Sequence, residues 1–262
     1  MERIQSSDGT PIAFDRSGEG PPVILVPGLF QHRANDPGTA ELAALLASRF
    51  TVFHYDRRGR GDSGDSAPYA VEREVEDIGA LIDEAGGSAA LFGMSSGGAL
   101  ALEAAARGLA VTKLAVYEPP FTDDEGNVDR SEELAAGIAE HVEAGRPGDA
   151  VAFFMTSSGV PADAVDQMRQ APFWAGLESV AHTMPYDMTL MGDPALLSER
   201  APTVAVPTLV IDGGASPPWG RRSADAVAAA VPGAERRTLE GQTHEVASEP
   251  LAPVLAEFFG RP

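Results

Sequence analysis

The chain alternates short runs rich in apolar and β-branched residues with segments of helical periodicity, and this alternation restricts its fold more than any other feature. The expected strands are Pro22–Val26, Phe50–Tyr55, Ala89–Gly93, Leu114–Tyr117, Thr208–Ile211 and Arg236–Leu239. The expected helices between and after them are Thr39–Ser48, Val71–Ala85, Gly97–Arg107, Arg221–Ala230 and Pro250–Phe259. Strands that alternate with helices form parallel sheets with helices on both faces. We therefore expect an α/β fold with a mostly parallel sheet.

Two parts of the chain depart from this alternation. Near the start, Asp8-Gly9 is a strong turn pair between Arg3–Ser6 and Pro11–Asp15, which predicts a hairpin. Between about Phe121 and Ala201 no β-rich run occurs. The helical segments expected there are Ser131–Ala144, with Ser131 as its N-cap, Val151–Met155, Ala162–Gln170 and Phe173–His182. Because the sheet pattern resumes afterwards, we expect a helical cap at residues 121–201, inserted in a core of residues 1–120 and 202–262.

Composition limits the classes of function. The 262 residues include 39 acidic and 19 basic ones, and the net charge of −20 disfavours nucleic acids and anionic membrane surfaces as partners. The chain has no cysteine, which excludes disulfides, cysteine-ligated metals and a cysteine nucleophile. No run approaches the ~18 apolar residues of a membrane span. The first residues also lack the apolar core of a signal peptide, so the expected location is the cytoplasm.

The segment Gly93-Met94-Ser95-Ser96-Gly97 lies between an expected strand and an expected helix. A sharp strand-to-helix turn with small neighbours lifts the middle side chain out of the backbone, beside a helix N-terminus that stabilises negative charge. A glycine-rich turn of a nucleotide-binding fold is the other interpretation of this pattern. The context favours Ser95 as a nucleophile.

A serine hydroxyl needs a base. His244 follows the last expected strand and can return to the sheet edge at which Ser95 lies, so we predict that it is the base. His54 falls inside an expected strand, and His141 and His182 fall in the cap. No histidine pair has metal-ligand spacing, and no metal site is expected.

An oxyanion hole needs two amides aimed at one point. Ser96, directly after the nucleophile, is expected to supply one of them. The other should come from the turn after Val23–Val26, and we assign it to Leu29, with Phe30 as the alternative.

Taken together, these features resemble the α/β-hydrolase superfamily over nearly the whole chain. The resemblance rests on Val26-Pro27-Gly28-Leu29, Asp56–Ser63, Gly93–Gly97 and His244. It implies a serine hydrolase that needs no cofactor, with a cap over the substrate site. It also implies a structural role for Asp56–Ser63, through arginine–carboxylate pairing. Family members usually have His where this chain has Pro27.

The acid of the triad is the larger departure from the family. Ser216 stands where the family usually has Asp, and a serine cannot carry the negative charge that stabilises the imidazolium. Glu118 ends the strand after the nucleophile helix, where some superfamily members carry their acid, and we favour it. Asp212, at the end of the neighbouring strand, and a Ser–His dyad with another polar group remain alternatives.

Apolar side chains are expected to line the substrate site. Those assigned to it are Phe30, Phe154, Trp174 and Trp219. With such a lining we expect hydrolysis of a small or medium apolar ester through an acyl-enzyme, whereas thioester, lactone, amide and carbon–carbon bond hydrolysis use the same machinery. A non-catalytic small-molecule receptor, an assisted cyclisation and perhydrolysis are further alternatives on the same fold. The oligomeric state is not predicted.

Overall fold

The computed structural model describes residues 1–121 and 127–261 and contains one eight-stranded sheet of order β1-β2-β4-β3-β5-β6-β7-β8. The strands are β1 (Glu2–Gln5), β2 (Pro11–Ser17), β3 (Pro22–Val26), β4 (Thr51–Tyr55), β5 (Ala89–Met94), β6 (Val111–Tyr117), β7 (Thr208–Gly213) and β8 (Glu235–Leu239). The expected hairpin forms β1 and β2, which pair antiparallel, and β2 also runs antiparallel to β4. All other pairs are parallel. The predicted α/β fold with a mostly parallel sheet is therefore confirmed.

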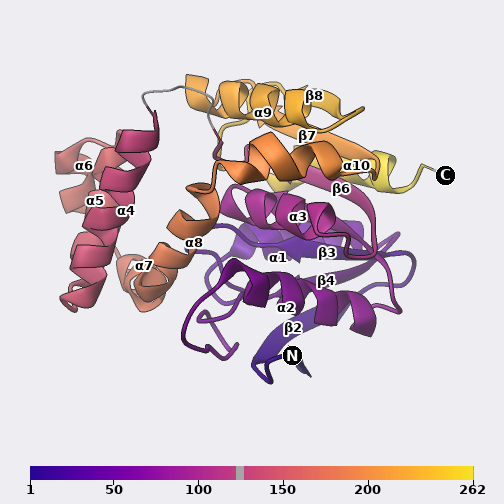
Figure 1. Cartoon of the computed structure of the whole chain (residues 1–262), viewed down its shortest axis with the longest axis horizontal. Coiled ribbons are helices and arrows are strands. Elements are labelled where there is room, and N and C mark those ends of the chain that lie inside the picture. The colour runs from indigo at the N-terminus through magenta and orange to yellow at the C-terminus, as the bar shows by residue number, and fades with distance from the viewer. Residues whose placement is uncertain (122–126, 262) are drawn as a thin grey trace.

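Helices cover both faces of this sheet, as Figure 1 shows. The helices of the core are α1 (Pro37–Leu46), α2 (Val71–Glu84), α3 (Ser96–Ala106), α9 (Pro218–Ala230) and α10 (Ser248–Phe259). Apolar side chains of α2, α3 and α9 form one buried cluster with residues of the sheet, whereas those of α1 and α10 form a second cluster on the opposite face. A strand that is buried on both faces needs apolar side chains on both, which explains the continuous apolar runs of β3 and β5.

The described residues between β6 and β7 contain helices and no strand, as the sequence predicts. The helices are α4 (Asn127–Glu143), α5 (Pro147–Ser157), α6 (Ala162–Met168), α7 (Trp174–Val180), η1 (Ala181–Thr183), α8 (Met184–Met191), η2 (Leu196–Arg200) and η3 (Ala201–Thr203). We call α4 to α8 the cap. In Figure 1, α4 to α7 stand to one side of the sheet, and α8 leads back towards α3. The division into a core of residues 1–120 and 202–262 and a cap of residues 121–201 stays a prediction.

The expected start of the first cap helix is wrong. The helix begins at Asn127, one turn before Ser131, so Ser131 lies inside it and is not its N-cap. No glycine or proline separates the two positions, and nothing in the sequence stops the helix from extending to the earlier residue.

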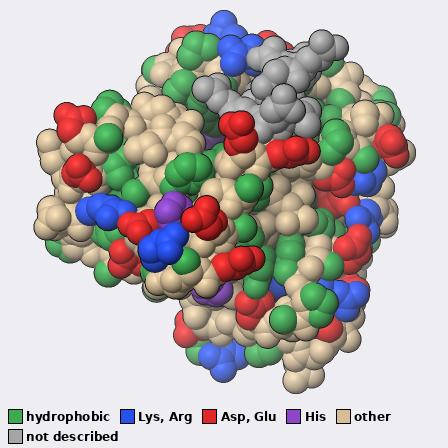
Figure 2. All heavy atoms as spheres, turned by 60° about the vertical axis from the view of Figure 1, so that its left-hand side comes forward, with side chains coloured by type: hydrophobic (Ala, Val, Ile, Leu, Met, Phe, Trp, Pro, Cys, Tyr) green, Lys and Arg blue, Asp and Glu red, His purple; other side chains and the backbone are tan. Residues whose placement is uncertain are grey.

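In the part of the chain that the structure describes, no helix has the length and hydropathy needed to cross a bilayer. Figure 2 shows the face that carries the cap, where acidic side chains are spread among apolar ones and do not gather in one patch.

The parallel strands end at a common edge. Val26 pairs with Gly93, Met94 with Tyr117, and Tyr117 with Ile211, so the residues that follow β3, β5, β6 and β7 emerge close together. In parallel α/β sheets, this carboxyl edge is where ligands bind.

Candidate active site

Ser95 lies in the turn between β5 and α3 with φ 53° and ψ −127°, a conformation that a non-glycine residue rarely adopts. The two glycines of the turn make this conformation possible. A Cβ on Gly93 would come within 2.3 Å of the Gly97 carbonyl oxygen, and one on Gly97 within 2.2 Å of the Val26 carbonyl oxygen. Any side chain at either position would therefore push the turn away from the sheet. The predicted elbow at Ser95 has the expected local geometry.

Glu118 directly follows β6 and is fully buried. Its Oε2 lies 2.7 Å from His244 Nδ1, and its Oε1 accepts a hydrogen bond of 2.8 Å from the Gly213 amide. Burial alone would raise the pKa of Glu118. The hydrogen bonds from His244, Ser216 and Gly213 outweigh burial and hold that pKa below its ordinary value. Glu118 is thus an ionised partner for the imidazole.

Ser216, the residue at the position where the family usually has an acid, is beside the Glu118 carboxylate. Its hydroxyl contributes to lowering the pKa of Glu118, although its buried Oγ makes no hydrogen bond of standard geometry within the described part of the chain. We regard the contacts of His244 and Gly213 as those that fix Glu118, because both have good geometry. The Glu118 carboxylate, which follows β6, therefore lies next to the side chain of residue 216.

His244 lies in the loop after β8, and Tyr117 ties this loop to the end of β6. The Tyr117 hydroxyl donates to the Thr243 carbonyl, and the Tyr117 carbonyl accepts a hydrogen bond of 2.9 Å from the Ser95 amide. One residue of β6 thus contacts both the nucleophile turn and the histidine loop. Among the described residues no hydrogen bond joins Ser95 Oγ to His244, a contact that is often long in ligand-free enzymes.

Two glycines make room for the Glu118 carboxylate and the histidine loop. A Cβ on Gly220, in α9, would lie 2.7 Å from Glu118 Cδ and 2.8 to 2.9 Å from both carboxylate oxygens. A Cβ on Gly213 would lie 2.4 Å from the Gln242 carbonyl oxygen. Neither glycine stands out in the sequence, because glycine is common in this chain and the neighbouring residues give no signal.

The loop after β3 approaches the nucleophile at Gly28, where a Cβ would lie 3.3 Å from Ser95 Cβ. The Gly28 amide donates to Gln31 Oε1 at 2.6 Å, whereas the amides of Leu29 and Phe30 make no hydrogen bond to any described residue. Phe30 has φ 66°. The loop that carries Leu29 and Phe30 thus approaches Ser95, and the oxyanion roles of Leu29, Phe30 and Ser96 stay predictions.

Backbone strain converges on this site. Among the described residues, the non-glycine residues with positive φ are Phe30, Ser95 and Glu118, at 66°, 53° and 41°. Such conformations cost free energy and cluster at functional sites, where the surrounding structure enforces them. All three are residues that the sequence assigns to the site.

The structure distributes the predicted substrate-binding side chains over two regions. Trp219 lies edge-on to the His244 ring, with 4.8 Å between ring centroids, and Phe30 lies edge-on to Phe154 at 5.7 Å. Trp174 is different: it is 5 % exposed in the apolar cluster of the cap, with its indole N–H bonded to Glu178. Phe30 and Phe154 pack against this same cluster, and the predicted role of Trp174 in substrate binding stays a prediction.

Asp212, the alternative acid, is engaged elsewhere. It is fully buried, and its Oδ1 accepts hydrogen bonds from Arg236 at 2.9 Å and from Thr238 at 2.8 Å. No hydrogen bond joins it to His244 in the described structure. His54 lies in β4, inside the strand in which the sequence places it, and is 5 % exposed.

The predicted pairing of arginines in Asp56–Ser63 is confirmed. Arg57, Arg58 and Arg60 are all buried, and each forms an ion pair with a buried carboxylate. The sequence analysis missed one partner, Asp187 in the cap. Its signal was weak: it is the lone charged residue in the otherwise mostly apolar stretch Met184–Met191.

A cavity of about 840 Å³ lies away from Ser95, between the cap and α9. Its lining includes Phe121, Ala135, Met191, Leu197 and Ala229, and none of the predicted site residues. Within residues 1–121 and 127–261, no three His, Asp or Glu side chains are grouped so that they could hold a metal ion.

Comparisons with known proteins agree with this architecture. An alpha/beta hydrolase from Sphaerobacter thermophilus is 55 % identical, with 98 % of this chain and 100 % of that chain covered and a TM-score of 0.86. An esterase from Exiguobacterium antarcticum has a TM-score of 0.75 over 99 % of both chains, but at 22 % identity this likeness concerns the fold alone.

A curated relative, polyketide synthase ThaQ of Burkholderia thailandensis, is 34 % identical over 108 residues. That match covers 40 % of this chain and 5 % of the synthase. Residues 23–257 match the family described as "Alpha/beta hydrolase family". The chain thus belongs to the alpha/beta hydrolase family.

Proposed function

We propose that this alpha/beta hydrolase is a serine carboxylesterase with Ser95, His244 and Glu118 as its catalytic triad. The observation that carries the proposal is the 2.7 Å contact between Glu118 and His244 Nδ1, beside a serine in a strained elbow. An ionised carboxylate on Nδ1 fixes the tautomer in which Nε2 can accept the serine proton, and it stabilises the imidazolium that results.

The reaction runs through an acyl-enzyme. Ser95 Oγ attacks the ester carbonyl carbon while His244 Nε2 takes the hydroxyl proton, and the amides of Leu29 and Ser96 stabilise the oxyanion. When the carbon–oxygen bond to the alcohol breaks, His244 gives this proton to the leaving oxygen. Water then attacks the acyl carbon while His244 takes its proton. When the bond between Ser95 Oγ and the acyl carbon breaks, His244 gives this proton to Ser95 Oγ, and the carboxylic acid leaves. No cofactor takes part.

The substrate class follows from the side chains around this centre. Leu29 and Phe30 contact the apolar cluster of the cap, and Trp219 lies against His244. We propose that Phe30, Phe154 and Trp219 bind the substrate, whose acyl and alcohol parts are apolar and of small or medium size. Residues 121–201 act as the cap of that site.

A fluorophosphonate tests the nucleophile without knowledge of the substrate. We expect wild type to gain the mass of one phosphonyl group and Ser95→Ala to gain none, with Ser48→Ala, at an exposed serine whose hydroxyl donates to the Leu45 carbonyl, as the control that is still labelled. A series of p-nitrophenyl esters of increasing acyl length, with one acyl thioester, then measures kcat/KM. Absence of labelling in folded wild type would contradict the proposal and favour a non-catalytic receptor.

A further inference from the structure

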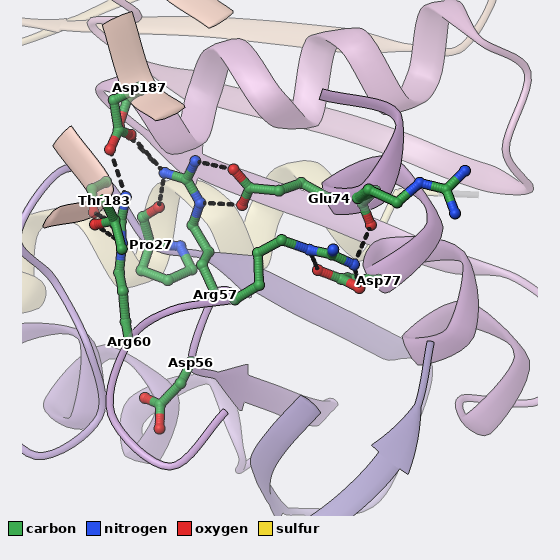
Figure 3. A network of polar contacts seen from close by, with 12 residues as sticks. Pro27, Asp56, Arg57, Arg60, Glu74, Asp77, Thr183 and Asp187 are labelled. Atoms are coloured by element: carbon green, nitrogen blue, oxygen red, sulfur yellow. Dashed lines mark hydrogen bonds and ion pairs between the residues drawn. The ribbon is translucent and has the colours of Figure 1, made fainter. Parts of the chain in front are cut away.

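A network of buried charges joins the cap to the loop that approaches Ser95. Its members are Arg57 and Arg60 from the loop after β4, Glu74 from α2 and Asp187 from α8, and their side chains are at most 2 % exposed. Figure 3 shows Arg57 between Glu74 and Asp187, with Arg60 next to Thr183 and bonded to the other oxygen of Asp187. Two guanidinium groups thus face two carboxylates, and the formal charges balance. Removal of one partner would leave a buried charge uncompensated.

Asp187 is the anion that the cap contributes. Its Oδ1 accepts from Arg57 Nη1 at 2.7 Å and its Oδ2 from Arg60 Nη2, while Thr183, also in the cap, accepts from Arg60 Nε at 3.1 Å. Burial alone would raise the pKa of Asp187, but the charges of Arg57 and Arg60 outweigh burial and keep that pKa below its ordinary value. The carboxylate is therefore ionised and holds both guanidinium groups.

The same two arginines bind the main chain of the loop after β3. Arg60 Nη1 donates to the Gly28 carbonyl at 2.6 Å, and Arg57 Nη1 donates to the Pro27 carbonyl at 3.4 Å. In a planar trans peptide the carbonyl and the following N–H point in opposite directions. By holding the Gly28 carbonyl, Arg60 therefore fixes the direction of the Leu29 N–H. A charged donor on that carbonyl also polarises the peptide and strengthens its N–H as a donor.

The residue that supplies the second proposed amide contacts the same carboxylate through its side chain. Ser96 is fully buried, its Oγ lies 3.4 Å from Arg57 Nη1, and its hydroxyl also interacts with Asp187. Both proposed donors, Leu29 and Ser96, are thus connected to one cap residue.

We infer that Asp187 is a positioning residue: through Arg57 and Arg60 it fixes the oxyanion amides, so that the cap is a structural part of the oxyanion hole. This inference rests on the proposed function, because it presupposes that Leu29 and Ser96 stabilise an oxyanion. It assigns to the cap a role in kcat besides its role in binding the substrate.

The neighbouring pair of Arg58 and Asp77 is the matched control. It is equally buried, at 0 % and 1 % side-chain exposure, with hydrogen bonds of 2.7 and 2.8 Å. The other described partners of Arg58 are Asp8, Ser66 and the Arg73 carbonyl, none of which belongs to the cap or to the loop after β3. Asp77→Asn therefore breaks a comparable ion pair without touching the oxyanion amides.

The experiment compares Asp187→Asn with Asp77→Asn by steady-state hydrolysis of one p-nitrophenyl ester, thermal unfolding and fluorophosphonate labelling rate. Loss of one oxyanion donor costs about 100- to 1,000-fold in kcat, so for misaligned donors we expect a loss of about 10- to 100-fold in Asp187→Asn. Since the acyl pocket is unchanged, KM should change by less than about threefold. Asp77→Asn should lower Tm but not kcat. The Leu29 amide resonance in a ¹⁵N–¹H spectrum should shift in Asp187→Asn alone.

Milder variants keep the inference testable if Asp187→Asn does not fold. Thr183→Val removes one hydrogen-bond acceptor from Arg60 at nearly constant side-chain volume. Arg60→Lys keeps the positive charge but lacks the branched guanidinium group that contacts both Asp187 and Gly28. Both should lower kcat, Arg60→Lys more strongly, and both should shift the Leu29 resonance.

Two negative outcomes can be told apart. If wild type is labelled, but the Asp187, Thr183 and Arg60 variants lose no more kcat than Asp77→Asn and leave the Leu29 resonance unchanged, the positioning role alone is wrong. If folded wild type is not labelled, the proposed function fails and this inference fails with it.

Discussion

The two sides of Ser95 are held in different ways. On the side of the base, Glu118 and His244 come from loops of the core. They are held by a few hydrogen bonds, one of them from the Tyr117 hydroxyl to the histidine loop, and Gly220 leaves room for the carboxylate. On the side of the oxyanion, the loop that carries Leu29 is held by buried guanidinium groups, one of whose counter-ions belongs to the cap. A change in the cap should therefore disturb the oxyanion amides and leave the acid–base pair in place. Changes around Glu118 should do the reverse.

Loss of the Glu118 charge should have the largest effect on the base side. We expect Glu118→Gln to lower kcat on the order of 10⁴-fold, the loss that follows when a triad carboxylate becomes an amide. Fluorophosphonate labelling should slow in parallel, because both reactions need an activated Ser95. Steady-state kinetics with a p-nitrophenyl ester measures the effect.

Asp212→Asn is the control for Glu118→Gln, since Asp212 is also buried at a strand end but pairs with Arg236 and Thr238. It should change kcat by no more than a few-fold. An inactive Asp212→Asn beside an active Glu118→Gln would refute the assignment of the acid.

Because residue 216 lies beside the Glu118 carboxylate, Ser216→Asp in the Glu118→Gln background should restore part of the lost kcat.

A smaller effect is expected where Glu118 is only displaced. In Gly220→Ala the new methyl group would lie 2.7 Å from Glu118 Cδ, so the carboxylate must move away from His244. A shift of about 1 Å in a catalytic group can cost up to about 100-fold, and we expect a loss of kcat of that order or smaller. Gly79→Ala is the matched helical control, because its methyl group would meet no atom closer than 3.8 Å. Equal kcat in Gly220→Ala and wild type would mean that Glu118 tolerates displacement.

The two sides of the site also differed in how much of them could be predicted from the sequence. The turn at Ser95, His244 after the last strand and Glu118 after β6 follow from local patterns, because each lies within five residues of the end of an expected strand. The contacts of Asp187 and Thr183 with Arg60 span more than 120 residues of chain. Helical periodicity shows that Met184–Met191 forms a helix but not which loop it will contact. The close approach of Gly220 to Glu118 also depends on how α9 packs, which no local pattern encodes.

The smallest expected effect is a difference in how stability depends on pH. The pKa of Glu118 in the folded protein is below its ordinary value of 4.5, because its hydrogen bonds outweigh its burial. The unfolded chain therefore binds the proton more readily, and the stability that ionised Glu118 contributes is fully present above about pH 4.5 and lost as the pH falls through the lowered pKa. Glu118→Gln lacks this contribution at every pH.

The difference in Tm between wild type and Glu118→Gln should consequently shrink as the pH falls below about 4.5. Thermal unfolding at a series of pH values measures it. Because the Glu118 carboxylate is buried, added salt should alter this difference little, whereas it weakens exposed ion pairs such as that of Arg16 and Glu2. A Tm difference that stays constant down to pH 3 would mean that the Glu118 charge does not stabilise the base side of the site. The base side and the oxyanion side, whose arginines depend on the charge of Asp187, would then differ only in the geometry of their contacts.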